Sequence, residues 1–159
     1  MPDDAALRDH VVELLTASHA HVDLVSVVGR VPADAWGRKP ARAPYTPWQL
    51  LEHIRLAQWD ILEFSRNADH VSPDWPDGYW PPSDEPSSLE AVKTSVSQVK
   101  TDLAAMVALV RDPSTDLFAR IPHGEGQTVL REALLVADHN AYHLGQLVLV
   151  LKQIGAWTE

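Results

Sequence analysis

The sequence predicts an all-α fold, a four-helix bundle with a long connection between its second and third helices. Three observations predict it: the placement of the twelve prolines, the signals at the ends of the stretches between them, and apolar residues spaced three and four apart. Proline inside a helix costs about 3 kcal/mol, so helices are expected where prolines are missing. Four such stretches remain, at residues 4–28, 46–66, 87–111 and 128–154.

The first predicted helix, residues 4–28, is followed by Gly29, where a left-handed C-terminal cap belongs. The sequence predicts no special role for its histidines, which are expected to be ordinary surface or core side chains. The same expectation holds for two histidines in later connections. These five residues are His10, His19, His21, His70 and His123.

The second predicted helix has the clearest start. Thr46 is placed to cap it, Pro47 occupies its first position, and Gln49 completes a capping box. Its apolar residues then step by four and three positions, which is the spacing of one helix face. They are Leu50, Ile54, Ala57, Ile61 and Phe64.

The second connection is about twenty residues long, and loops of that length in a compact domain are usually functional or disordered. Its segment Trp75–Pro82 contains three large aromatic residues, which argue against disorder. Two interpretations are open. The aromatic residues cap the end of the bundle and wall a pocket, or they only pin a long crossover to the bundle.

The third predicted helix begins at a second capping box, Ser87-Ser88-Leu89-Glu90, and the fourth ends before Gly155. The fourth helix is apolar on two sides. Since a bundle normally buries one side, the other is a candidate interface, and we expect a homodimer. One stripe is Leu130, Leu134, Ala137, Ala141, Leu144, Val148 and Leu151; the other holds Val136, Leu147 and Val150 together with His139 and His143.

The composition is that of a single globular domain, residues 1–159, with 45% hydrophobic and 22% charged residues. The chain has no cysteine, which excludes disulfides and thiolate metal sites. A formal charge of −9 disfavours nucleic acids and anionic membranes as partners. The N-terminus shows no secretory signal and no long apolar stretch follows, so a cytoplasmic location is expected.

The last predicted helix carries the main candidate for chemistry. His139 and His143 are four residues apart, so both imidazoles project from one helix face. The pair is not a zincin motif, because Asn140 stands where that motif has glutamate. His53, at the edge of the apolar face of the second helix, is a third candidate ligand; the alternative is a core histidine bonded to a backbone carbonyl. Three neutral imidazoles suit zinc, nickel, copper or iron and leave coordination positions open.

Two segments resemble the DinB/YfiT-like superfamily, and the resemblance covers essentially the whole chain. It implies a four-helix bundle with a divalent metal, usually zinc or nickel, held by three histidines, which are His53, His139 and His143 here. Relatives include thiol-dependent enzymes such as mycothiol- and bacillithiol-linked transferases and isomerases. The segments are Thr46-Pro47-Trp48-Gln49-Leu50-Leu51-Glu52-His53-Ile54 and Asp138-His139-Asn140-Ala141-Tyr142-His143-Leu144-Gly145-Gln146.

Four further residues are near enough on their helices to fix the orientation of the imidazoles. Asp60 is two turns, about 10 Å, from His53, which is too far to share a metal with it on a straight helix. The alternative is that all four are ordinary bundle or surface residues. They are Asp60, Asn140, Tyr142 and Gln146.

The sequence therefore predicts a divalent-metal-dependent enzyme acting on a small molecule, either a hydrolase or a thiol-dependent transferase that uses a low-molecular-weight thiol. Both reactions need only an open metal and a nucleophile brought to it. Two alternatives remain open: a non-catalytic bundle that binds a metal or small ligand in a stress response, and a plain dimeric structural protein. Because only neutral imidazole binds a metal, affinity is expected to fall below pH ~6.5.

Overall fold

Five α-helices and one short 3₁₀ helix make up the computed structural model, which describes residues 4–17 and 20–157. The described residues contain no β-strand, only an isolated bridge between Arg120 and Thr128. The all-α prediction is therefore confirmed. The elements are α1 (Ala5–Thr16), α2 (Leu24–Gly29), α3 (Pro47–Arg66), η1 (Asp77–Tyr79), α4 (Leu89–Arg111) and α5 (Val129–Gln153).

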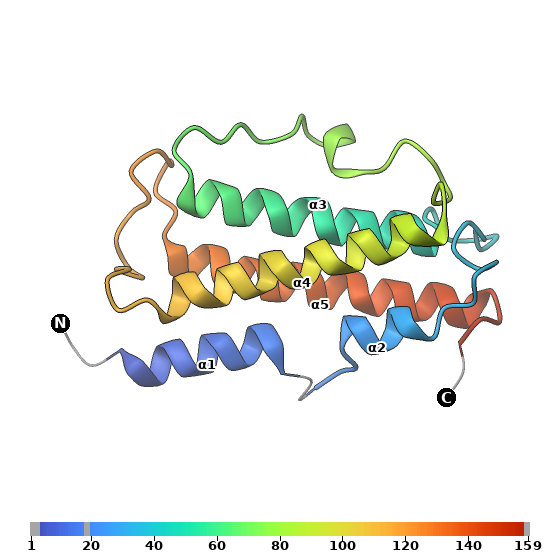
Figure 1. Ribbon diagram of the computed structural model, residues 1–159, viewed down its shortest axis with the longest axis horizontal. Coiled ribbons are helices and arrows are strands. Elements are labelled where there is room, and N and C mark those ends of the chain that lie inside the picture. The colour runs from blue at the N-terminus through green and yellow to red at the C-terminus, as the bar shows by residue number, and fades with distance from the viewer. Residues whose placement is uncertain (1–3, 18–19, 158–159) are drawn as a thin grey trace.

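The long connection between α3 and α4 follows from their directions. Figure 1 shows both helices running the same way, so the chain has to return along the whole length of α3 before α4 begins. The 20 residues of α3 span about 30 Å, which an extended chain needs about nine residues to cover. Residues 67–88 exceed that minimum, and the surplus forms η1 beside the middle of α3.

The first predicted helix is broken, which corrects the expectation of one helix over residues 4–28. α1 ends at Thr16, whose hydroxyl donates to the Val12 carbonyl, and α2 starts after Asp23, whose carboxylate accepts from the Ser26 amide. Short polar side chains compete with the helix for its backbone groups in this way. The two segments follow one another along the same side of the bundle (Figure 1). His21 lies in the connection between them, and His19 lies outside the described residues.

The predicted helix ends are mostly confirmed. Thr46 and Gln49 form the expected capping box at the start of α3, and Gly155 after α5 has φ of 69°. Two details were wrong. Ser88 caps α4 one residue later than expected, and Gly29 is the last residue of α2 with no positive φ.

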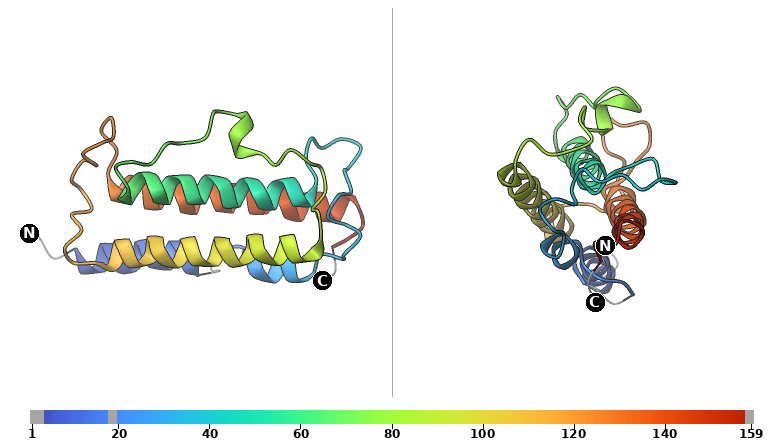
Figure 2. Two further views of the ribbon diagram at one scale, coloured as in Figure 1. Left: turned by 45° about the horizontal axis from the view of Figure 1, so that its top comes forward. Right: turned by 90° about the vertical axis from the view of Figure 1, so that its right-hand side faces the viewer.

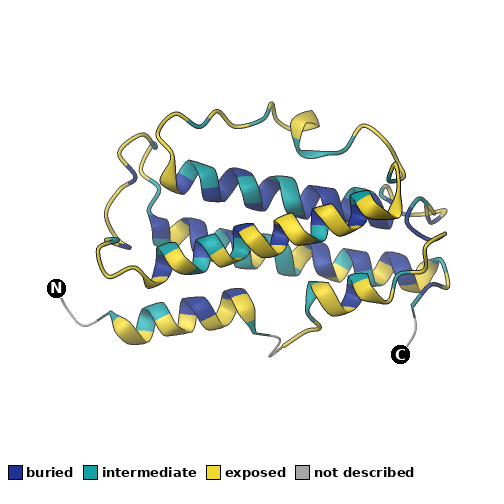
Figure 3. Ribbon diagram, in the orientation of Figure 1, coloured by how far each residue is buried: buried dark blue, intermediate teal, exposed yellow. Residues whose placement is uncertain are grey.

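The core lies between α3 and its two long neighbours. α3 packs against α5 and α4, and α1 packs against α4 and α5, an arrangement visible end-on in Figure 2. The inward faces of the helices are buried and the outward faces exposed (Figure 3). On α5 most of both predicted stripes is buried. Val136 and Leu147 of the stripe that holds the two histidines are fully inside. Of the other stripe, Leu144 and Leu151 are 5% and 1% exposed, whereas Leu134 is 41% exposed.

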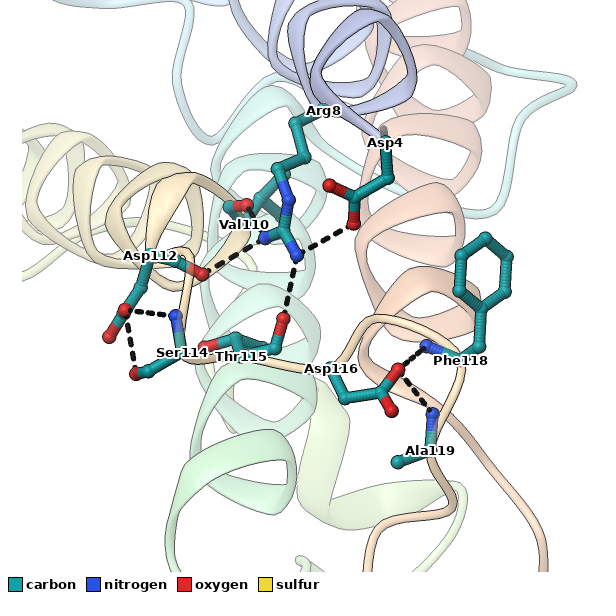
Figure 4. Close-up of polar contacts among 9 residues, drawn as sticks. All are labelled: Asp4, Arg8, Val110, Asp112, Ser114, Thr115, Asp116, Phe118 and Ala119. Atoms are coloured by element: carbon teal, nitrogen blue, oxygen red, sulfur yellow. Dashed lines mark hydrogen bonds and ion pairs between the residues drawn. The ribbon is translucent and has the colours of Figure 1, made fainter. Parts of the chain in front are cut away.

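Arg8 of α1 ties the N-terminal helix to the end of α4, as Figure 4 shows. Its guanidinium donates to the carbonyls of Val110 at 2.6 Å, Asp112 at 3.0 Å and Thr115 at 2.7 Å, and it pairs with Asp4 at 2.8 Å. Carbonyls in the last turn of a helix have no partner within the helix. Arg8 therefore acts as a C-terminal cap supplied by another element.

We expect Arg8→Met to lower the thermal midpoint by several degrees, because the last carbonyls of α4 lose charged donors while the apolar stem is kept. Differential scanning calorimetry measures the change. The control is Arg42→Met, an exposed arginine. Equal midpoints in the two variants would contradict the capping role of Arg8.

No helix among the described residues is long and apolar enough to cross a membrane.

Candidate metal centre

Three histidines from two helices converge beside the core. His53 comes from α3, and His139 and His143 come from successive turns of α5. The Nε2 atom of His53 lies 3.1 Å from Nε2 of His143 and 3.2 Å from Nε2 of His139. The three residues each offer one ring nitrogen, all within 4.8 Å of one another. The structure thus brings together all three residues that the sequence predicts as metal ligands.

Local structure explains the convergence. His139 and His143 share one face because an α-helix repeats every 3.6 residues. That face is a buried stripe of α5, which packs directly on α3, the helix that carries His53. The side chains of His53 and His143 are only 4% and 8% exposed.

Hydrogen bonds orient two of the three rings. Nδ1 of His53 donates to the backbone carbonyl of Tyr79 at 2.9 Å, and Nδ1 of His143 faces Oε1 of Gln146 at 2.9 Å. A neutral imidazole has one N–H and one lone pair. Since both partners are oxygens that accept, each Nδ1 carries the proton and each Nε2 presents its lone pair. Nδ1 of His139 is buried without a hydrogen-bond partner among the described residues.

These tautomers make the cluster a good fit for a cation. The lone pairs of His53 and His143 face each other across 3.1 Å with no proton between them, an arrangement that repels unless a positive charge lies between. Two nitrogens bound to one ion at about 2.1 Å are separated by about 3.0 Å at right angles and about 3.4 Å in a tetrahedron. The observed separations of 3.1 and 3.2 Å lie within that interval.

The electrostatic surroundings keep the three imidazoles neutral. Burial, together with the neighbouring imidazoles of His143 and His53, lowers the pKa of His139 to about 4. Burial also lowers the pKa of His53 and that of His143. Neutral imidazole is the form that binds a metal, so the protein presents three ready ligands near neutral pH.

An aromatic stack covers one side of the cluster. The ring of Trp80 lies parallel to His53, with centroids 3.9 Å apart and an interplanar angle of 1°. Tyr45 stacks on the other face of Trp80, also at 3.9 Å. On the other side, the ring of Tyr142 meets His143 edge-on at 4.8 Å. The stack holds His53 at a fixed angle and shields it from water.

The cluster opens into a cavity of about 560 Å³. The connection between α3 and α4 supplies Trp75, Pro76, Tyr79 and Trp80 to its wall. In Figure 1 the connection runs along the side of α3 rather than across the end of the bundle. The remaining lining residues come from α3, α5 and the segment before α3: Tyr45, His53, Ala57, Asp60, Ile61, Leu135, Asp138, His139, Tyr142 and His143.

The carboxylate of Asp60 on α3 holds the connection that forms this wall. The hydroxyl of Tyr79 donates to Oδ2 of Asp60 at 2.7 Å, and Nε2 of His70 lies 2.7 Å from Oδ1 of the same carboxylate. Burial and the hydrogen bond to Asp60 raise the pKa of Tyr79 to about 12, so its hydroxyl stays a donor. Tyr79 is therefore held to α3 at two points, through its carbonyl at His53 and through its hydroxyl at Asp60.

The four predicted supporting residues behave differently from one another. Gln146 contacts His143 through a hydrogen bond and Tyr142 packs against the same ring. Asn140 instead donates to Gln58. Asp60 lines the cavity but contacts none of the three histidines through its carboxylate, which is bonded to His70 and Tyr79.

Sequence reasoning missed the contributions of Tyr45, His70 and the Tyr79 carbonyl. His70 is a core histidine with a polar partner, one of the two kinds expected for it: its side chain is 7% exposed and bonded to Asp60. The aromatic richness of Trp75–Pro82 was a signal for the wall. No sequence signal marks which backbone carbonyl meets His53.

The family model of the DinB superfamily matches residues 11–147, a span that includes all three histidines and the whole connection between α3 and α4. The chain belongs to the DinB superfamily. Comparison with curated proteins and with solved structures gives no significant match. For this DinB-superfamily protein, family and geometry together fit a divalent-metal site at His53, His139 and His143.

The lowered pKa of His139 predicts how the stability of the metal-free DinB-superfamily protein changes with pH. His139 titrates near 6.5 when unfolded but near 4 when folded, so between these values only the unfolded chain takes up the proton. The free energy of unfolding should therefore have its highest value above pH 6.5 and fall as the pH drops toward 4.

Urea titrations of the metal-free protein at pH 7.5, 6 and 5 measure this dependence. We expect His139→Ala to show a shallower loss over the same range, because its folded state no longer excludes that proton. Parallel curves for the variant and the wild type would contradict the assignment of the loss to His139.

Proposed function

We propose that this DinB-superfamily protein is a divalent-metal-dependent enzyme that acts on a small molecule, with His53, His139 and His143 as its metal ligands. The observation that carries the proposal is the convergence of three Nε2 atoms, two of them with lone pairs fixed toward each other, at the wall of a cavity of about 560 Å³. Zinc and nickel are the proposed ions, since both accept neutral imidazole.

The donor set supports catalysis over a purely structural metal. Three imidazoles leave an ion with coordination positions free and with its full charge, whereas structural zinc sites close the fourth position with a protein ligand. When bound, such an ion lowers the pKa of a coordinated water or thiol and polarises an electrophile. A hydrolase and a thiol-dependent transferase both use that chemistry.

The chain's own residues supply position and exclusion of water. The Tyr79 carbonyl and Gln146 hold two imidazoles in the tautomer that presents Nε2. Trp80 and Tyr45 shield His53 on one side. Ile61 and Leu135 add apolar surface to the cavity wall. Charges inside a site that excludes water interact more strongly than they do in water.

Elemental analysis of the purified protein, followed by turnover assays, tests the proposal. We expect one zinc or nickel per chain, and turnover of an ester, an amide or a thiol–electrophile pair that a chelator abolishes and added metal restores. Stoichiometric metal without turnover across the panel would favour a non-catalytic metal-binding bundle. A protein without bound metal, and unable to take it up, would overturn the metal site itself.

A further inference from the structure

The described charged residues that line the cavity are all acidic. Two of its described lining residues, Asp60 and Asp138, are acidic, and none is lysine or arginine. The chain as a whole carries a formal charge of −9, so no distant excess of positive charge offsets the two carboxylates. The three imidazoles are neutral, for the reasons given above. A ligand in this cavity therefore meets negative groups and, at the histidine cluster only, the positive charge of an ion.

The two carboxylates are not equivalent. Both oxygens of Asp60 are engaged, one by Tyr79 and one by His70, and the residue is buried. Asp138 is exposed on α5, next to His139 in the chain, and its carboxylate has no hydrogen bond or ion pair with any described residue. Asp60 thus serves the architecture of the wall, whereas Asp138 is free to meet a ligand.

Aromatic rings complete the mouth of the cavity. Trp75 is 77% exposed and Tyr142 is 64% exposed, although both line the cavity. Aromatic side chains are common in the lining of small-molecule sites. Aromatic faces attract cations such as ammonium groups and offer nothing comparable to an anion.

We propose that the small molecule bound here carries a positively charged amine on a part of its body other than the atom that faces the metal centre. Asp138 and the exposed rings of Trp75 and Tyr142 receive the ammonium group, while a neutral or anionic donor atom faces the metal centre. This inference rests on the proposed function, because it assigns the substrate class of that same site. It excludes substrates whose bodies carry carboxylates or phosphates remote from the reacting atom.

Three probes that bind a metal through one ring nitrogen only test the selection: imidazole, 1-(3-aminopropyl)imidazole with an ammonium group, and 3-(imidazol-1-yl)propanoate with a carboxylate. Calorimetric titration of the metal-loaded protein at pH 7.5 gives the three dissociation constants. We expect 1-(3-aminopropyl)imidazole to bind about tenfold more tightly than 3-(imidazol-1-yl)propanoate, the combined effect of one exposed carboxylate and one cation–π contact.

The two charged probes also differ in ways that do not involve Asp138. Each variant is therefore judged by the ratio of two dissociation constants, that of the carboxylate probe over that of the ammonium probe. Asp138→Asn is expected to reduce that ratio at least about threefold. The matched control is Asp9→Asn on α1, which changes the net charge equally at an exposed position outside the cavity lining. Its ratio should equal that of the wild type.

Two outcomes overturn the inference while leaving the proposed function intact, in a protein that binds metal and plain imidazole. One is equal affinity for the ammonium and the carboxylate probe, and the other is a ratio that Asp138→Asn does not change. A protein that takes up no metal overturns the proposed function and this inference with it.

Discussion

Replacing His143 by alanine is expected to lower the affinity for a divalent ion by more than about 100-fold, beyond the 10–100-fold that loss of an outer partner typically costs. The reason is that two imidazoles remain where three converge, and His143 is one of the two whose lone pair is fixed by a hydrogen bond. The bundle should stay folded, because its core lies between α3, α4 and α5 and does not depend on this side chain.

Competition titration with a chromophoric chelator measures the affinity, and far-UV circular dichroism of the metal-free protein checks the fold. The matched control is His10→Ala, which removes an exposed histidine of α1 and should leave metal affinity unchanged. A folded His143→Ala protein that binds one ion per chain with wild-type affinity would show that the three-histidine assignment is wrong.

Replacing Trp80 by alanine is expected to produce the second largest effect, on both stability and metal affinity. Removing the half-buried ring that stacks between Tyr45 and His53 should cost about 2 kcal/mol of unfolding free energy. Because His53 loses the ring that fixes its angle, metal affinity should also fall about 10-fold or more.

Trp75→Ala is the matched variant, since Trp75 lies in the same connection but is 77% exposed. We expect its unfolding midpoint and its metal affinity to equal those of the wild type, because its ring touches none of the three histidines. The comparison distinguishes the two interpretations of the connection. Lower stability with unchanged metal affinity in Trp80→Ala would mean that the segment only pins the crossover to the bundle.

The sequence by itself determined the features that depend on neighbours in the chain. The long helices follow from proline-free stretches and apolar spacing, and the caps at Thr46 and Gly155 follow from local hydrogen bonding. The pairing of His139 with His143 on one face is likewise a property of helix geometry. Each of these signals lies within a few residues of the structure it predicts, so no knowledge of the fold is needed to read them.

Tertiary structure alone decided the features that depend on distant parts of the chain. The break between α1 and α2 is different, because it reflects local competition between short polar side chains and the helix, which apolar periodicity does not register. Packing against α3, α1 and α4 buries most of both apolar stripes of α5, which the pattern of a single helix does not reveal. The Tyr79 carbonyl reaches His53 only because α3 and α4 run in the same direction and return the connection along α3. Contacts of this kind depend on which surfaces bury each other best, and that is a property of the whole molecule.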